Sequence, residues 1–220
     1  RVPVVASEIP VPEQAFDEML DTAGRDLEDL KAELVSRTNE KIGISTEAVI
    51  GTVVDRINEI SERNSPFAVV MGMREGKSLE RMLLGSNSFY SIMHNPYPVL
   101  IIPENTHYRE IRKIGLACDL EAVGETIPFR LLAEWLSAFK ATLDIIHVSK
   151  REKDSLPADV SQSISLQNHL NKFHPRFKFL SGRNITERLN EYTREENLDL
   201  LIVIPKHHGF AGIFDKKYSR

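Results

Sequence analysis

Residues 52–72 read TVVDRINEISERNSPFAVVMG, a short polar-faced segment followed at once by an apolar, β-branched run. Its first part, Thr52 to Arg63, has the 3.6-residue periodicity of a helix. Thr52 is a good N-cap, with Asp55 three residues later to complete a capping box. The run from Phe67 to Gly72 predicts a buried strand. A capped helix leading into a buried strand is the repeating unit of an α/β protein.

The same unit recurs about 130 residues further along the chain. Arg56 to Ile60 matches Arg188 to Tyr192, and Asn64 to Met71 matches Asn197 to Ile204, at offsets of 132 and 133 residues. Helix and strand recur in the same order, which predicts an internal duplication. A coincidence between two generic strand–helix units is the alternative that the short match leaves open.

The rest of the chain continues the alternation of strands and helices. The patterns predict further helices at 12–39, 79–93, 124–140, 161–173 and 184–195, the last capped by Asn184 with Glu187 at the box position, and strands at 43–51, 97–102, 111–119, 143–148, 177–180 and 198–204. Such alternation with near-continuous apolar strands predicts an α/β fold with parallel sheets covered by helices on both faces. We expect two tandem domains, 1–104 and 110–220. The first lacks a counterpart of the strand–helix–strand at 111–148, and the second lacks a final helix and edge strand.

Bulk composition excludes several classes of protein. The 220 residues carry a net charge of -4 without a basic stripe, which argues against nucleic-acid binding. The longest apolar runs are too short to span a bilayer. The single cysteine, Cys118, excludes an intrachain disulfide and suits a reducing compartment. With no signal peptide before Arg1, we expect a cytoplasmic protein with no membrane contact through this chain.

Ligands of open parallel sheets bind beyond the carboxyl ends of the strands, at a switch in strand order. The first such place is the segment after Met71, with Gly72, Gly76, Gly85 and Ser86, where glycine backbone can wrap an anion. The second is Asp119, at the carboxyl end of the strand predicted at 111–119. Its carboxylate is suited to accept hydrogen bonds from a ribose or a base.

These segments resemble the universal stress protein family. Its loop has a glycine after the fourth strand and a Gly-Ser pair before the next helix, followed by a Pro-Val-Leu strand. Gly72, Gly85-Ser86 and Pro98-Val99-Leu100 match that order.

The resemblance implies two Rossmann-like domains of the adenine nucleotide alpha hydrolase type. It also implies a site for ATP or AMP in the first domain. The implied cofactor-binding residues are Gly72, Arg74, Gly76, Gly85, Ser86, Asn87 and Asp119.

Two departures from the family pattern weaken the implied nucleotide sites. Glu75 occupies the place of the loop's second glycine, and a carboxylate about 4 Å from a phosphate repels it by a few kcal/mol. Arg74 and Lys77 are near enough in sequence to offset that charge. In the second domain Pro205 replaces the first glycine and has no N–H to donate. We therefore expect nucleotide binding to be lost in the second domain.

Several side chains also have simpler interpretations. Asp119 is equally well explained as a cap for the following helix. Cys118 fits a buried core position better than a nucleophile. His207 and His208 are adjacent and lack a third ligand at suitable spacing, so we expect no metal. No catalytic motif is present, so no enzyme class is indicated.

The sequence thus predicts a non-catalytic stress-response protein, either a nucleotide sensor or a protein-interaction module. The resemblance implies an intramolecular pseudo-dimer of the two domains through their edge strands, and it leaves a homodimer open. Two alternatives remain: a cytoplasmic regulatory domain of a membrane antiporter, and a weak ATPase or nucleotidyl-transferring enzyme.

Overall fold

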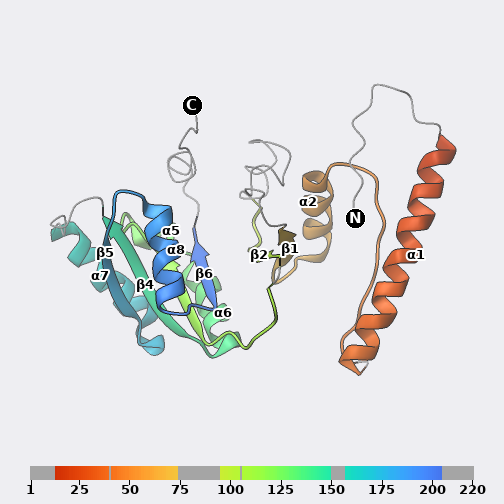
Figure 1. The fold of residues 1–220 in the computed structure, drawn as a ribbon. Helices are drawn as coiled ribbons and strands as arrows, with labels where there is room; N and C mark the ends of the chain where they lie inside the picture. The colour runs from red at the N-terminus through yellow and green to blue at the C-terminus, as the bar shows by residue number, and fades with distance from the viewer. Residues whose placement is uncertain (1–12, 40, 74–94, 105, 150–156, 205–220) are drawn as a thin grey trace. The chain divides into compact units, whose positions relative to one another are not determined.

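The computed structural model describes residues 13–39, 41–73, 95–104, 106–149 and 157–204 (Figure 1). The chain divides into two compact units, Arg1–Thr106 and His107–Arg220. Both units contain parallel strands and helices, as the alternating pattern predicts. Among the described residues, no helix is both long and apolar enough to cross a bilayer.

Unit 1 contains two described helices, α1 (Glu13–Thr38) and α2 (Val53–Asn64), and a two-stranded parallel sheet. Strand β1 (Val69–Met73) pairs with β2 (Val99–Pro103), in a register that runs from Val69 opposite Val99 to Met73 opposite Pro103. These elements confirm the predicted helices at 12–39 and 52–63 and the predicted strands at 67–72 and 97–102. The helix predicted at 79–93 lies outside the described residues.

The strand predicted at 43–51 is wrong, because residues 43–50 join no ladder in the part of unit 1 that the structure describes. A strand exists only where its backbone pairs with a neighbour. Here side chains make the contacts instead: Thr46 donates to Glu28 of α1, and Glu47 forms an ion pair with Arg63 of α2. The β-branched residues of this segment remain accessible, with Val49 40% and Ile50 53% exposed.

Unit 2 contains a four-stranded sheet in the order β5-β4-β3-β6, with every pair parallel. Its strands are β3 (Lys113–Ala117), β4 (Thr142–Ser149), β5 (Arg176–Ser181) and β6 (Leu200–Val203). Its helices are α5 (Val123–Thr126), α6 (Phe129–Phe139), α7 (Pro157–Leu170), the 3-10 turn η1 (Asn171–Phe173) and α8 (Ile185–Glu195). The switch in strand order lies between β3 and β6.

The single helix predicted at 124–140 is two helices, α5 and α6. Ile127, the C-cap of α5, is extended (φ -93°, ψ 118°), and Pro128 follows it as the N-cap of α6. A proline disfavours helical geometry in the residue before it and cannot donate the helical hydrogen bond itself. The helix therefore ends at this proline and starts again after it.

Helices cover both faces of the unit 2 sheet. Leu143 and Ile145 of β4 belong to the core that contains Leu136 of α6 and Leu166 of α7. Ile146 points to the other face, where it packs with Leu189 and Tyr192 of α8 and with Leu198, which follows α8. Neighbouring side chains along a strand point to opposite faces, so α8 lies across the sheet from α6 and α7 (Figure 1).

The helices that precede β1 and β6 begin in the same way. Thr52 Oγ1 accepts a hydrogen bond from the Asp55 amide at 3.2 Å, and Asn184 Oδ1 accepts one from the Glu187 amide at 3.3 Å. Both cap interactions predicted from the sequence are therefore confirmed. Their ends differ: Ser65, the C-cap of α2, is left-handed (φ 45°), whereas Glu196, the C-cap of α8, is right-handed and the left-handed Asn197 (φ 53°) follows it.

Candidate functional site

The carboxyl end of β3 leads into a tight turn of residues 118–122, here called the β3 turn, beside the switch in strand order. Leu120 (φ 60°) and Ala122 (φ 44°) both adopt left-handed backbone conformations. The turn is held from within, because the Leu120 amide donates to Cys118 Sγ at 3.4 Å. At its far end the Val123 amide donates to Gln162 Oε1 of α7 at 3.0 Å. The turn is therefore anchored to both the sheet and a helix.

Asp119 is an exposed member of the β3 turn, and its Oδ1 accepts a hydrogen bond from the Glu121 amide at 3.1 Å. The residue at the N-cap of the following helix, α5, is Ala122. Asp119 therefore stabilises the turn and does not cap the helix, which removes that alternative interpretation. A carboxylate at a solvent-exposed strand end is chemically suited to accept hydrogen bonds.

His147, on β4, supports the β3 turn from the neighbouring strand, and the sequence analysis did not single it out. Its Nδ1 lies 3.1 Å from the carbonyl oxygen of Cys118. A carbonyl oxygen only accepts, so Nδ1 carries the hydrogen and donates it. The half-buried ring also lies 6.1 Å from the ring of Phe179 on β5. The sequence feature that could have identified His147 is a single histidine inside the apolar run at 143–148.

Cys118 belongs to the core, as its position on an apolar strand predicts. It is 9% exposed and packs in the cluster that contains Leu116 and Leu120. Burial of a thiol among aliphatic side chains disfavours its thiolate form, so Cys118 is poorly suited to act as a nucleophile.

In unit 1 the structure places one of the predicted loop residues. Gly72 is exposed, lies on β1 opposite Ile102 of β2, and would have open space around an added Cβ. It is therefore free of steric constraint among the described residues. The other predicted loop residues, Arg74, Gly76, Gly85, Ser86 and Asn87, lie outside the described residues, as does Glu75. Asp119 belongs to the other unit.

Metal ligands do not gather anywhere in the described parts of the chain. No group of three or more histidine, cysteine or acidic residues there has the geometry to hold an ion. His207 and His208 lie outside those parts.

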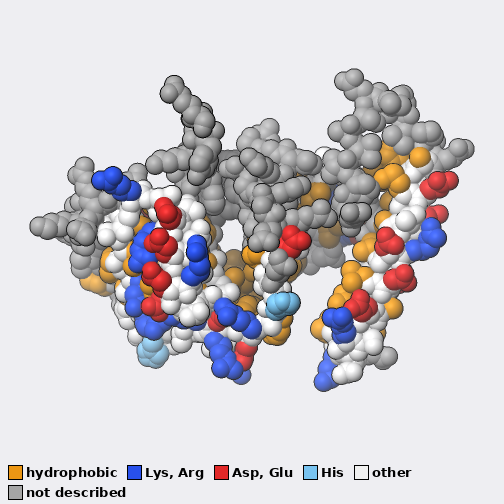
Figure 2. Space-filling model, viewed as in Figure 1, with side chains coloured by type: hydrophobic (Ala, Val, Ile, Leu, Met, Phe, Trp, Pro, Cys, Tyr) orange, Lys and Arg blue, Asp and Glu red, His pale blue; other side chains and the backbone are white. Residues whose placement is uncertain are grey.

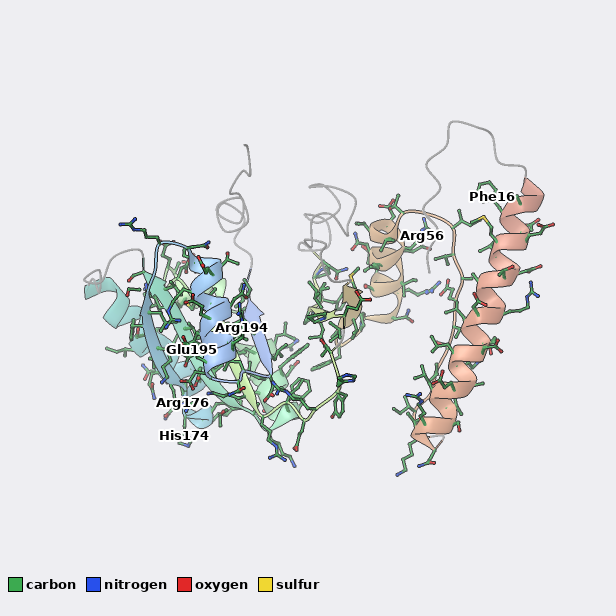
Figure 3. All side chains as sticks on the ribbon, viewed as in Figure 1. Phe16, Arg56, His174, Arg176, Arg194 and Glu195 are labelled. Atoms are coloured by element: carbon green, nitrogen blue, oxygen red, sulfur yellow. The ribbon has the colours of Figure 1, made fainter. Side chains whose placement is uncertain are left out.

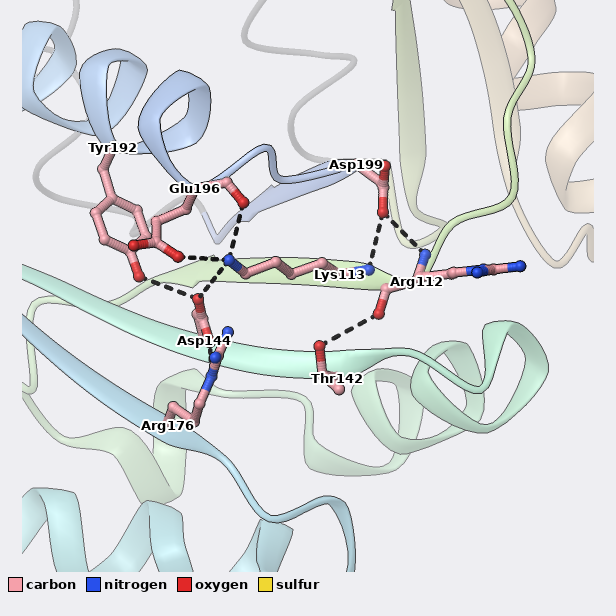
Figure 4. A network of polar contacts seen from close by, with 8 residues as sticks. All are labelled: Arg112, Lys113, Thr142, Asp144, Arg176, Tyr192, Glu196 and Asp199. Atoms are coloured by element: carbon pink, nitrogen blue, oxygen red, sulfur yellow. Dashed lines mark hydrogen bonds and ion pairs between the residues drawn. The ribbon is translucent and has the colours of Figure 1, made fainter.

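A second polar centre lies at the amino ends of the same strands, away from the β3 turn (Figure 4). Asp144 of β4 is completely buried and accepts hydrogen bonds from Arg176 Nε at 2.7 Å and from the Tyr192 hydroxyl at 3.0 Å. Lys113 Nζ lies 3.8 Å from Asp144 and 2.6 Å from the carboxylate of Glu196. We call these five residues the Asp144 network. Three strands and the end of α8 meet in it.

The Asp144 network shifts the ionisation of its members. The pKa of the Tyr192 hydroxyl is raised, mainly by burial and to a smaller extent by the hydrogen bond to Asp144. The hydrogen bond to Asp144 also raises the pKa of Arg176, and the hydrogen bond from Lys113 lowers the pKa of Glu196. The shifts of Arg176 and Glu196 favour their charged forms, and the shift of Tyr192 favours the neutral hydroxyl that donates to Asp144. Asp144 is a buried carboxylate whose charge is neutralised and hydrogen-bonded by these neighbours, so we interpret the network as structural.

Residues 3–103 match the model of the Universal stress protein family. The match includes β1, β2 and the segment between them that carries the predicted glycine loop. No curated protein matches the chain.

Solved structures resemble the chain over most of its length. One is a universal stress protein from Archaeoglobus fulgidus DSM 4304, with a TM-score of 0.64 and 21% identity, covering 91% of this chain and 71% of that one. Another is a functionally unknown protein from Pseudomonas aeruginosa PAO1, with a TM-score of 0.57 and 15% identity, covering 86% of this chain and 70% of that one. At these identities the likeness establishes the α/β fold.

Proposed function

We propose that this chain acts as a universal stress protein, a non-catalytic nucleotide sensor or protein-interaction module built from two tandem copies of one α/β domain. The observation that carries the proposal is the family match over residues 3–103. That match contains the predicted loop residues from Gly72 to Asn87.

The duplication is supported by local geometry as well as by the sequence repeat. Helices α2 and α8 have N-caps 132 residues apart, each accepting from the amide three residues later, and each helix leads into a parallel strand. The offset between the two caps equals the offset of the first match in the sequence repeat, which favours a duplication over two unrelated strand–helix units. The two copies differ in the strands described beside them, since β1 pairs with β2 and β6 pairs with β3.

For the nucleotide, ATP or AMP, we propose a site in the first copy. Gly72, Arg74, Gly76, Gly85 and Ser86 would surround the phosphates, where glycine amides and a cationic side chain favour an anion. Gly72 lies one residue before the end of β1 without crowding, which is compatible with a close approach of the ligand to the backbone.

In the second copy the β3 turn presents Asp119 at the carboxyl end of β3, a strand without a counterpart in the first copy. The segment after β6 begins with Pro205, which donates no amide hydrogen. We therefore propose that the first copy binds the nucleotide and that the second copy has lost this ability.

The test is calorimetric titration of ATP and of AMP into the full chain, up to about 1 mM nucleotide. We expect Gly85→Val to weaken binding at least about tenfold, because a β-branched side chain blocks the backbone from the phosphates. Asp119→Ala is the matched variant in the second copy and should leave the affinity unchanged. If Asp119→Ala abolished binding and Gly85→Val did not, the nucleotide site would lie in unit 2.

Two outcomes would change the proposal. If neither nucleotide binds at that concentration, the sensor role is wrong and the interaction-module role is what remains. Glu75→Gly tests the expected repulsion, because an unchanged affinity would mean that this carboxylate does not face the phosphates.

A further inference from the structure

Asp199 lies between α8 and β6, and its carboxylate contacts three donors in the segment by which the chain enters unit 2. Its Oδ1 lies 2.8 Å from Arg109 Nε. Its Oδ2 accepts hydrogen bonds from the backbone amides of Arg112 and Lys113, both at 3.0 Å (Figure 4). Lys113 is the first residue of β3, so the carboxylate holds both the strand and the residues before it. We call these contacts the Asp199 clamp.

Further bonds reinforce the Asp199 clamp. The Arg109 guanidinium also donates to the Leu198 carbonyl at 3.3 Å, and the Asp199 amide donates to the Lys113 carbonyl at 2.9 Å. Only 12% of the Asp199 side chain is exposed, so water competes little for its oxygens. Hydrogen bonds to an ionised carboxylate are roughly twice as strong as bonds between neutral groups.

The clamp differs from the other ion pair of the same segment. Charged side chains gather at the surface where the chain enters unit 2 (Figure 2), and Arg112 and Glu110 form an ion pair there. The Glu110 side chain is 65% exposed, and such a surface pair contributes little to stability. Asp199 is therefore the acidic residue that fixes this part of the chain.

The segment just before the clamp is short. In unit 1 the Thr106 amide donates to the carbonyl of Pro103, the last residue of β2, at 3.3 Å. Two residues, His107 and Tyr108, lie between that bond and the clamp at Arg109. Both are exposed, Tyr108 to 94%.

The clamping carboxylate is specific to the second copy of the repeat. At the offset of 133 residues Asp199 matches Pro66, which has neither a carboxylate nor an amide hydrogen. The helix–strand unit therefore forms without this acceptor in the first copy. This difference favours a role at the junction of the two units over a general requirement of the helix–strand unit.

We propose that the Asp199 clamp fixes the end of the segment that joins the two units, so that movement between the units takes place at residues before Arg109. The argument depends on contacts made inside unit 2. A short tether also raises the effective concentration of each unit at the other. The inference goes beyond the proposed nucleotide function and does not depend on it.

Cleavage by chymotrypsin after Tyr108 tests the proposal, because cleavage requires the residues around the bond to detach from the fold. We expect the full chain to be cleaved at least about tenfold more slowly than a peptide of residues 103–113, as measured by mass spectrometry. Asp199→Ala should raise the rate in the full chain at least about tenfold. Arg109→Gln should raise it at least about threefold, relative to a peptide with the same substitution.

Matched controls remove the same chemical groups from α8, where Figure 3 shows both residues. Glu195→Ala removes a carboxylate that pairs with Arg188 at 3.3 Å, and Arg194→Gln removes an exposed guanidinium. Each should change the rate of cleavage after Tyr108 less than about twofold.

Cleavage at other sites distinguishes release of the clamp from unfolding of unit 2. Trp135 and Tyr192 are buried, so cleavage after them requires unfolding. We expect Asp199→Ala to accelerate cleavage after Tyr108 and to leave these two sites protected. If Asp199→Ala unfolds the unit, Arg109→Gln carries the test, because it leaves both backbone bonds to the carboxylate in place.

Three results would overturn the proposal. One is a full chain that is cleaved as fast as the peptide, which would mean that the junction is not held. Another is resistance to cleavage in every variant, which would mean that a different contact protects the junction. The third is equal acceleration by Arg109→Gln and Arg194→Gln, which would make the effect one of net charge.

Discussion

The hydroxyl of Tyr192 donates a hydrogen bond of 3.0 Å to the carboxylate of Asp144, across 48 positions of the chain and inside the core. Asp144 is fully buried, and Tyr192 is 4% exposed. The bond therefore joins α8 to the centre of the sheet where water does not compete for either group.

Replacing Tyr192 by phenylalanine removes this bond and keeps the ring. We expect the free energy of unfolding to fall by about 1.5–3 kcal/mol, the range for a hydrogen bond to a charged group. Urea denaturation followed through Trp135 fluorescence would measure the change. Thr142→Val is the matched control in the same unit, since the Thr142 hydroxyl donates to the Arg112 carbonyl at an exposed site, and a loss as large as that of Tyr192→Phe would contradict the argument.

Removal of the buried charge should cost more than removal of the tyrosine hydroxyl. Asp144→Asn keeps the shape of the side chain, leaves Arg176 without its anion and leaves Lys113 paired with Glu196 alone. We expect a loss of about 3–5 kcal/mol in the free energy of unfolding, measured in the same way. Glu110→Gln, which breaks the exposed ion pair with Arg112, should change stability by less than about 1 kcal/mol. Similar losses in the two variants would show that burial of Asp144 does not matter.

Alkaline pH should destabilise unit 2 through Tyr192. Its pKa is higher in the folded protein than the usual value of about 10, so the unfolded chain releases this proton more readily. The stabilisation is therefore complete below about pH 10 and declines as the pH rises above that value. Unfolding measured from pH 8 to 11 should show a smaller decline in Tyr192→Phe than in the unmodified chain, and parallel curves would contradict this assignment.

Gly115 of β3 is closely surrounded by side chains of the neighbouring strands and of the segment after α8. A Cβ on this residue would lie 2.6 Å from Leu198 Cδ1 and 2.9 Å from Ile146 Cδ1. We expect Gly115→Ala to cost about 1–3 kcal/mol of stability through overpacking. Gly124→Ala is the control, because its Cβ would meet nothing within 4 Å. Thermal unfolding of both variants distinguishes crowding from a general effect of replacing glycine.

His147 should keep the β3 turn closed. His147→Leu removes the donor to the Cys118 carbonyl, and hydrogen exchange at Leu120 and Glu121 should become faster. His147→Asn places an amide N–H near the position of Nδ1 and should restore slow exchange in part. Equal exchange in the unmodified chain and the leucine variant would mean that the turn does not depend on this bond.

Local features of the fold were readable from the sequence. The caps at Thr52 and Asn184 act within one helical turn, so the neighbouring residues suffice to predict them, and both are present. The break at Pro128 was equally local and was overlooked, because the apolar periodicity continues across it. Six predicted strands have counterparts among the described residues, since buried strands carry a strong apolar signal.

Features that depend on distant residues were not readable. Residues 43–50 have the composition of a strand and form none, because pairing requires a neighbouring backbone that composition does not specify. The Asp144 network draws one residue each from β3, β4 and β5 and two from α8 and the residue after it, at no recognisable spacing. The hydrogen bond from His147 to the Cys118 carbonyl depends on the pairing of β4 with β3, which the sequence around His147 does not specify. Helix capping and periodicity act between near neighbours in the chain, whereas ladders and buried charge pairs form between residues that only folding brings together.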